Sequence, residues 1–323
     1  MVRGWLILAG VICAAVVASS CRISINGGYN FDYKGAKSER NEIGDIDSSI
    51  REIVVNNRFG KIVVTRQAEK PGWEWTGACW ATKSEDADKF LGELKLDVSQ
   101  TGETQTWTVE IPDSDRSLRG VRSNLTIRVP ASVNVVTENR HGDTQIERTS
   151  GSVNVSSHHG NVQLDELVGS VKVSNRHGKV VANGLAAASE FNIQHGPANI
   201  SGTHGPLIVN SRHGNVKLEN VGAQVTAEMH HGDLTATQVR ANVGFESHHG
   251  SVSLNMIGDQ FTSIMGDGGH SNIKITLPKD CTPNADVDLS HGRLRSTVST
   301  DSKSKVLIKI DASHTNVTLG KSE

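Results

Sequence analysis

A His-Gly pair recurs along the middle of this chain at a constant interval. The repeated histidines are His141, His159, His177, His195, His213, His231 and His249, each 18 positions after the one before (159 − 141) and each followed by glycine. A fixed interval of this kind is typical of a solenoid, in which one small unit stacks on copies of itself. Because the same side chain returns in every unit, we expect these histidines to form a ladder along one edge of the stack. The histidine is called position 0 of each repeat below.

Apolar residues return at the same positions of each repeat. Positions +3 and +5 are apolar, as in Val162 and Leu164, and so are positions +12 and +14, as in Val171 and Val173. This spacing of two is that of a β-strand with one face turned inward. The glycine after each histidine can take a positive φ at a tight corner, and the Gly or Ala at position +10 suits a second corner. Each repeat is therefore predicted to form one coil of strand, corner, strand and corner.

The sequence on the N-terminal side of the ladder does not follow the regular repeat. The segment Asn57-Arg-Phe-Gly60 resembles the repeat, with Phe59 in the histidine slot. Ser84 is a candidate N-cap for a short helix whose apolar residues would share one face. Residues 46–135 are therefore predicted to be a β-rich segment that begins and caps the solenoid, because an uncovered solenoid end is prone to aggregation.

Regular coils are predicted over residues 136–268, followed by irregular coils over residues 269–323. Asp267-Gly268 stands one full interval after His249 (267 − 249), which predicts a coil that has lost its histidine, and His291-Gly292 then resumes the pattern. The predicted fold class is all-β: a single-chain β-solenoid, or β-helix, of about 18-residue coils with an N-terminal β-rich cap that carries one short helix.

Residues 1–21 are predicted to be a lipoprotein-type signal peptide. Arg3 precedes an apolar run, which ends in Val17-Ala-Ser-Ser-Cys21. Small residues before a cysteine at this place resemble a bacterial lipobox, in which Cys21 would be lipidated and become the first mature residue. Ordinary cleavage and an uncleaved anchor helix are the alternatives. Residues 22–45, rich in small and polar side chains, are predicted to form a flexible tether.

Two cysteines remain beyond the signal segment, Cys79 and Cys281. An exported protein can pair such residues, but spacing does not establish a disulfide. We expect two unpaired, mostly buried thiols, since the sequence has no CxxC motif and no Cys/His metal spacing.

Several functional classes find no support in the sequence. The formal charge is −2 and no basic stripe is present, which argues against nucleic-acid binding. Acidic residues are scattered over the repeat, and residues 141–259 contain no Trp or Tyr to stack on sugars. Neither a Ser/His/Asp motif nor a phosphate-binding glycine loop nor HExxH is found. An enzyme is therefore not expected.

The order of several motifs resembles the bacterial putative-adhesin domain family, a group of exported β-solenoid proteins. The motifs are the opening segment Ile53-Val-Val-Asn-Asn-Arg-Phe-Gly-Lys-Ile-Val-Val, the short helical insert, Ile127-Arg-Val-Pro130, the repeated Gly-x-Val-x-Val spacing and Ile275-Thr-Leu-Pro278. The resemblance extends over about 46–320. It implies an envelope or surface location and a binding or structural role, with no catalytic residues to transfer.

The histidine ladder itself admits three interpretations. The rings can be architectural, each stacked on the ring of the next coil. They can bind Zn, Ni or Cu, because imidazole is a common metal ligand. They can also sense pH, because protonated rings at coil spacing repel one another.

The metal interpretation has preferred residues. Position −1 adds further histidines beside the ladder and creates adjacent pairs. No carboxylate column is expected beside these pairs. The densest candidate cluster is His230, His231, His248 and His249, and a further pair is His158 and His159.

The sequence thus predicts a non-enzymatic lipoprotein of the bacterial envelope that acts as an adhesin-like binding or structural solenoid. The expected partners are the membrane, through the N-terminal lipid, and a protein or glycan. The alternative is a metal-binding or metal-buffering surface protein that uses the ladder.

Overall fold

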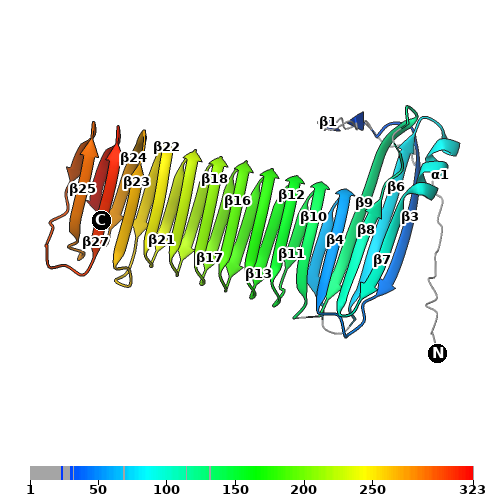
Figure 1. The fold of residues 1–323 in the computed structure, drawn as a ribbon, viewed down its shortest axis with the longest axis horizontal. Helices are drawn as coiled ribbons and strands as arrows, with labels where there is room; N and C mark the ends of the chain where they lie inside the picture. The colour runs from blue at the N-terminus through cyan, green and yellow to red at the C-terminus, as the bar shows by residue number, and fades with distance from the viewer. Residues whose placement is uncertain are drawn as a thin grey trace. The chain divides into compact units, whose positions relative to one another are not determined.

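The computed structural model describes residues 23–24, 30–31, 33–67, 70–113, 115–130 and 132–322. They belong to two compact units, Met1–Gly151 and Ser152–Glu323. Strands dominate both units (Figure 1), as the sequence predicted for an all-β solenoid. The predicted signal peptide and the lipidation site Cys21 lie outside the described residues.

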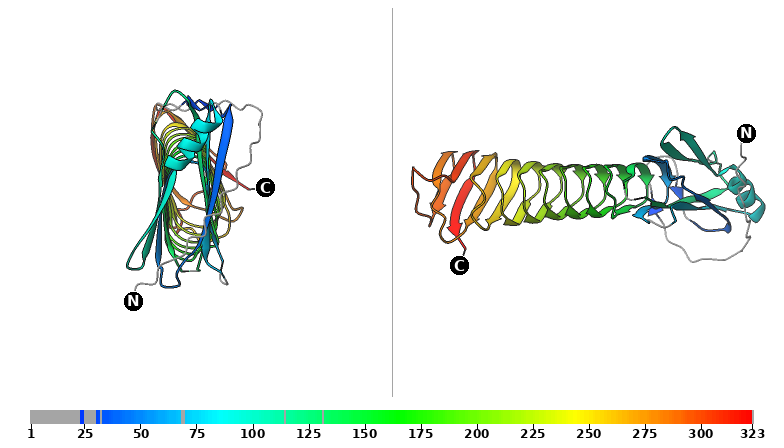
Figure 2. Two further views of the ribbon diagram at one scale, coloured as in Figure 1. Left: turned by 90° about the vertical axis from the view of Figure 1, so that its right-hand side faces the viewer. Right: turned by 90° about the horizontal axis from the view of Figure 1, so that it is seen from below.

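The C-terminal unit is a stack of two-stranded coils (Figure 2), in which neighbouring coils pair in parallel. Val153 lies beside Val171 and Val171 beside Ser189, so each residue meets its counterpart 18 positions away. The first sheet begins with β12 (Val153–His159), β14 (Val171–His177), β16 (Ser189–His195), β18 (Leu207–His213) and β20 (Val225–His231). The second begins with β13 (Val162–Leu167), β15 (Val180–Leu185), β17 (Ala198–Thr203), β19 (Val216–Val221) and β21 (Leu234–Val239). Strand β22 (Val243–Met256) continues through a corner into both sheets.

The apolar columns predicted from the sequence fill the interior of these coils. Val162 and Leu164 are fully buried, as are Val173 and Leu167. Leu167 stands at position +8, which breaks the alternation of two that positions +3 and +5 begin. The residue before it, Glu166, has φ 56°, and this left-handed residue turns position +8 back toward the interior.

The same left-handed residue recurs at position +7 of successive coils. It is glycine in two coils and a larger residue in the others: Glu166, Gly184, Gly202, Asn220 and Gln238 in the C-terminal unit, with φ between 54° and 68°. For a residue with a Cβ atom this conformation costs about 1–2 kcal/mol, so the coils carry unequal local strain.

The last strands of the C-terminal unit are not stacked in chain order. Strand β27 pairs with both β23 and β25, so the final coil of the chain lies between the two that precede it. The strands concerned are β23 (Ser263–Gly268), β24 (Ser271–Leu277), β25 (Asn284–Ser290), β26 (Arg293–Ser296), β27 (Leu307–Ser313) and β28 (Asn316–Lys321).

The prediction that Asp267-Gly268 takes the histidine slot is wrong. Gly250 pairs with Ser271, which brings His270 beside His249. Val243 pairs with Ile264, which lies 21 positions further on (264 − 243), so this coil is longer than the regular repeat. The extra residues lie in the second corner, at 257–262, and the register of β22 with β21 shifts just before that corner, between Ala236 and Val239.

The N-terminal unit combines parallel coils with antiparallel strands. Strand β4 (Glu52–Phe59) pairs in parallel with β10 (Asn134–His141) and β8 (Thr104–Glu110), and β5 (Ile62–Arg66) does so with β11 (Thr144–Glu147) and β9 (Leu118–Val129). Antiparallel strands then follow on each sheet: β7 (Lys95–Thr101) on β8, β6 (Gly72–Ala81) on β9, and β3 (Ala36–Asp45) on β6. Strands β1 (Ile23–Ser24) and β2 (Asn30–Phe31) form a separate antiparallel pair.

The β-rich segment with a short helix is therefore present, although its details differ from the prediction. Helix α1 (Ser84–Glu93) buries Ala87, Phe90 and Leu91 as expected, but its N-cap is Lys83 rather than Ser84 and has no capping side-chain bond. The first His-Gly coil, β10 with β11, belongs to this unit, whereas the sequence placed the boundary after residue 135.

The predicted tether over residues 22–45 is wrong for residues 36–45. These residues form β3, which pairs with β6 along its whole length from Ala36 with Ala81 to Asp45 with Gly72. The polar composition that suggested a tether reflects an edge strand, because a strand at a sheet edge is often charged to discourage pairing with other chains.

The two cysteines in the described residues are free thiols. Cys79 on β6 is fully buried, and this burial raises its pKa to about 12. Cys281 is half-buried, and burial raises its pKa as well. The expectation of unpaired thiols is thus confirmed for these two residues.

Gln238 is one of the left-handed residues at position +7. We expect Gln238→Gly to stabilise the protein by about 0.5–1 kcal/mol, because glycine adopts this φ without the Cβ penalty. Gln238 is exposed, so little packing is lost. The converse change, Gly202→Ala, should destabilise by about 1 kcal/mol, because its new methyl group has room and only the backbone is strained. Chemical denaturation measures both, with Thr235→Gly as an ordinary strand control that should lose stability. A destabilised Gln238→Gly variant would contradict this account.

Candidate functional site

The ladder histidines of the C-terminal unit form one column of stacked imidazole rings. From His159 to His249 the neighbouring ring centroids are 4.7–5.0 Å apart and the ring planes differ by only 2–5°. The column continues from His249 to His270, then to His314 and finally to His291, with centroid distances of 5.4, 4.8 and 4.9 Å. We call these residues the histidine column; they are His159, His177, His195, His213, His231, His249, His270, His314 and His291.

The glycine after each regularly spaced histidine explains why the rings from His159 to His249 align. Gly178 has φ 130°, and a methyl group on its Cα would lie 2.1 Å from the carbonyl oxygen of Gly160 in the preceding coil. Gly196 would clash with Gly178 in the same way, at 2.2 Å. In the regular coils, successive corners therefore approach one another so closely that only glycine fits, whereas Ser271 and Thr315 follow His270 and His314 in the last coils. This contact fixes each histidine directly beside the histidine of the next coil.

Polar side chains around the corner hold the backbone. At position +2, Asn161 Oδ1 accepts a hydrogen bond from Lys179 N at 3.0 Å, and Asn215 Oδ1 accepts one from Asp233 N at 2.9 Å. At position −2, the buried Asn175 donates from Nδ2 to the carbonyl oxygen of Gly160 at 3.2 Å. The corner is thus built by residues other than histidine, which leaves the rings on its solvent side.

The N-terminal unit contains the same corner with a different ring. Phe59 occupies the histidine slot of β4, as the sequence predicted, and stacks on His141 with centroids 5.1 Å apart and planes 8° apart. Asn139, fully buried, donates from Nδ2 to the carbonyl oxygen of Gly60 at 3.0 Å. A phenyl ring has no lone pair for a metal and no proton to exchange. Its presence in the slot therefore favours stacking as the shared role of this position.

The candidate metal cluster separates into two different pairs. His231 and His249 belong to the histidine column, where parallel rings direct their nitrogens along parallel lines. His230 and His248 lie one residue earlier, with centroids 5.0 Å apart and planes inclined by 25°. The third histidine at this position, His158, lies beside Arg176 in the register of the next coil rather than beside another histidine.

The expectation that no carboxylates accompany the cluster is wrong. His230 Nε2 lies 3.2 Å from Glu228 Oε1, and His248 Nε2 lies 3.1 Å from Glu246 Oε1. Glu228 and Glu246 are register partners on neighbouring coils. Each of these two coils therefore contributes one histidine and one glutamate from the same face of its strand. In the part of the chain that the structure describes, however, no three His, Cys, Asp or Glu side chains converge as a metal site.

A family model described as Toastrack DUF4097 matches residues 50–320, most of the chain. The chain belongs to the Toastrack DUF4097 family. No curated protein sequence matches it. The assignment to this Toastrack family agrees with the coils described above.

Three solved structures match over 88% of the chain. They include a putative adhesin from Parabacteroides distasonis ATCC 8503, with 12% identity, 97% of that chain covered and a TM-score of 0.41. A putative adhesin from Bacteroides fragilis NCTC 9343 has 11% identity, 97% coverage and a TM-score of 0.35. A putative cell adhesion protein from Clostridium sporogenes ATCC 15579 has 12% identity, 100% coverage and a TM-score of 0.21.

Sequence reasoning on this Toastrack chain missed two members of the histidine column, His270 and His314, because neither follows the regular interval. A signal for both was nevertheless present. His270-Ser-Asn-Ile-Lys-Ile and His314-Thr-Asn-Val-Thr-Leu share the order of His213-Gly-Asn-Val-Lys-Leu. Histidine, Asn at position +2 and apolar residues at +3 and +5 therefore mark these two corners, in which no glycine follows the histidine.

Because the rings of the histidine column are solvent-exposed at His231 and His249, alanine at either position should cost less than about 1 kcal/mol of stability. The glycine contact and the backbone hydrogen bonds of the corner remain in both variants. The denaturant midpoints of His231→Ala and His249→Ala measure this, with Gly196→Ala as a control that should be severely destabilised. Large losses in the histidine variants would show instead that the rings themselves hold the coils together.

Proposed function

We propose that this protein is a non-enzymatic, lipid-anchored component of the bacterial envelope that acts as an adhesin-like binding or structural module. The observation that carries the proposal is the outer surface of the coils. Outward side chains bond to their counterparts along the stack: Asn183 Nδ2 donates to Asp165 Oδ1 at 2.7 Å, and Ser201 Oγ donates to Asn183 Oδ1 at 2.7 Å. Such a surface is rigid, polar and repetitive, which suits contact with another surface.

One carboxylate on the outer surface of the coils, Glu190, has a structural role. A general acid needs a carboxyl whose pKa is raised toward neutrality. Glu190 shows the opposite, because the hydrogen bond from Asn192 and the contact with Lys172 lower its pKa. Glu190 therefore serves as a permanent acceptor in a surface network.

The membrane anchor in this proposal rests on the sequence alone. The apolar run and the small residues before Cys21 resemble a lipobox, and a lipid on Cys21 would place the solenoid at an envelope surface. Among the described residues, no helix is long and apolar enough to span a bilayer.

Lipidation is testable through Cys21. When the full-length protein is expressed in a bacterium fed with labelled palmitate, we expect label on the protein and its recovery in the membrane fraction. Cys21→Ala should lose the label and leave the membrane fraction or remain unprocessed, whereas Cys281→Ala should behave as the unaltered protein. An unlabelled protein with an intact Cys21 would refute the anchor.

A second candidate function is metal binding by the outer pair of histidines, and we propose His230, His248, Glu228 and Glu246 as its ligands. Zn–N bonds of about 2.0–2.1 Å require two ligand nitrogens to approach to roughly 3.3 Å. The rings of His230 and His248 are inclined by 25°, whereas the column rings from His159 to His249 differ by only 2–5° from one to the next. Their side chains are about half exposed, at 46% each, so they can turn toward a shared ion at little cost in packing.

Calorimetric titration of the full-length protein with Zn²⁺, Ni²⁺ and Cu²⁺ tests this candidate. Saturable, submicromolar binding that His230→Ala/His248→Ala loses and His195→Ala/His213→Ala keeps would support it. The control pair removes two adjacent rings of the histidine column and leaves the outer pair intact. Weak binding, or binding that survives in His230→Ala/His248→Ala, would leave the histidines with an architectural role.

A further inference from the structure

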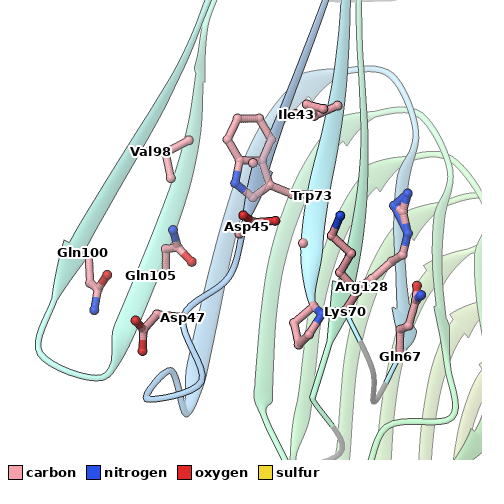
Figure 3. A pocket seen from close by; sticks show the side chains of 13 residues that line it. Ile43, Asp45, Asp47, Gln67, Lys70, Trp73, Val98, Gln100, Gln105 and Arg128 are labelled. Carbon is pink, nitrogen blue, oxygen red and sulfur yellow. The ribbon is translucent and has the colours of Figure 1, made fainter. Parts of the chain in front are cut away.

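The N-terminal unit contains a pocket of about 800 Å³ between its two sheets (Figure 3). One wall comes from β3 and β6, the other from β7 and β8, and the connection that follows β3 contributes Asp47. The volume falls within the range of about 300–1,000 Å³ that small-molecule sites occupy. None of the histidines lines this pocket, so it is separate from the candidate sites described above.

An aromatic ring stands at one wall of the pocket. Trp73 on β6 is the register partner of Gly44 on β3, and a methyl group on Gly44 would lie 2.5 Å from the indole Cε2 atom. The absence of a side chain at Gly44 therefore lets the indole lie against the neighbouring strand. Trp75, two residues further on β6, is fully buried and donates from Nε1 to Ser123 Oγ at 2.7 Å. Trp73 is only half-buried, and it lines the pocket instead.

A buried amide faces the pocket from the other sheet. Gln105 on β8 is 9% exposed, and its Oε1 atom has no hydrogen-bond partner within the described residues. A buried carbonyl oxygen without a donor costs about 1–3 kcal/mol, which a ligand with a hydroxyl group would recover. An apolar ligand would leave this cost in place, so the pocket favours a polar one.

The charged groups of the pocket are balanced. Asp45 and Asp47 supply carboxylates, while Lys70 and Arg128 supply cations (Figure 3). Hydrogen bonds from the Ser49 hydroxyl and the Ser49 N–H lower the pKa of Asp47, so this group remains an acceptor at neutral pH. With equal numbers of each sign, the pocket has no preference for a strongly charged ligand.

We propose that this pocket binds a neutral sugar residue of a glycan. A pyranose ring has an apolar C–H face that packs on an aromatic ring, and hydroxyl groups that both donate and accept hydrogen bonds. Trp73 provides the ring, Gln105 and the carboxylates provide acceptors, and Lys70 and Arg128 provide donors. The inference names the ligand class of the adhesin-like role and therefore rests on that proposed function.

An array of immobilised neutral oligosaccharides, ending in glucose, galactose, mannose or N-acetylglucosamine, tests the proposal with the full-length protein. We expect saturable binding to at least one of these termini. Trp73→Ala should weaken that binding at least tenfold. The matched control is Ile208→Ala, which removes an exposed apolar side chain in the C-terminal unit and should bind as the unaltered protein does.

A second variant separates binding from folding. Gln105→Met keeps the size of the side chain and removes the unpartnered carbonyl, so its thermal midpoint should be unchanged or higher while sugar binding falls. If the protein binds none of the oligosaccharides, the sugar site is overturned. Binding that both Trp73→Ala and Gln105→Met retain would overturn it as well. The Cys21 labelling experiment needs no sugar, so it reports on the anchored role separately from this pocket.

Discussion

The close contact between glycine corners of successive coils is the constraint on which the rest of the solenoid depends. A side chain at Gly178 or Gly196 would collide with the carbonyl oxygen one coil earlier, so the corner permits one spacing and one register. Parallel strands at that spacing place every residue beside its counterpart 18 positions away. The buried apolar columns, the polar ladders and the stacked imidazoles all result from this register. The longer coil between β22 and β23 departs from it, with extra residues in the other corner and a register shift between Ala236 and Val239.

The register also divides the histidines into two chemical classes. Rings at the corner stack in parallel from His159 to His249, and the pairing of Phe59 with His141 shows that a ring without nitrogen fills the same place. Rings one residue earlier have glutamates on their own strand and are inclined to one another. The chemistry available to a histidine in this protein therefore depends on a shift of one residue along the strand, because neighbouring residues of a strand point in different directions.

The N-terminal unit departs from the repeat, and its distinct chemistry lies there. Antiparallel strands replace further coils, so the walls of its pocket are not constrained to present like residues side by side. Trp73 and Gln105 can therefore come together with carboxylates and cations from other strands and from connecting segments. The edge strand β3 carries charges along its length, which protects it from pairing with other chains. The N-terminal unit therefore brings different side chains together, whereas the regular coils place similar side chains side by side.

The sequence by itself determined the coil: its period, its strands, its glycine corners and the Phe59 slot, because each depends on residues that are close in the chain and recur. It did not determine the places where the period fails. The left-handed residues at position +7 share no side-chain type, and β27 lies between β23 and β25 through pairing of distant segments. The strand β3, the glutamates beside His230 and His248, and the pocket around Trp73 likewise join residues whose separation follows no repeat. Only the tertiary structure decided these features, because they depend on which strands become neighbours rather than on local pattern.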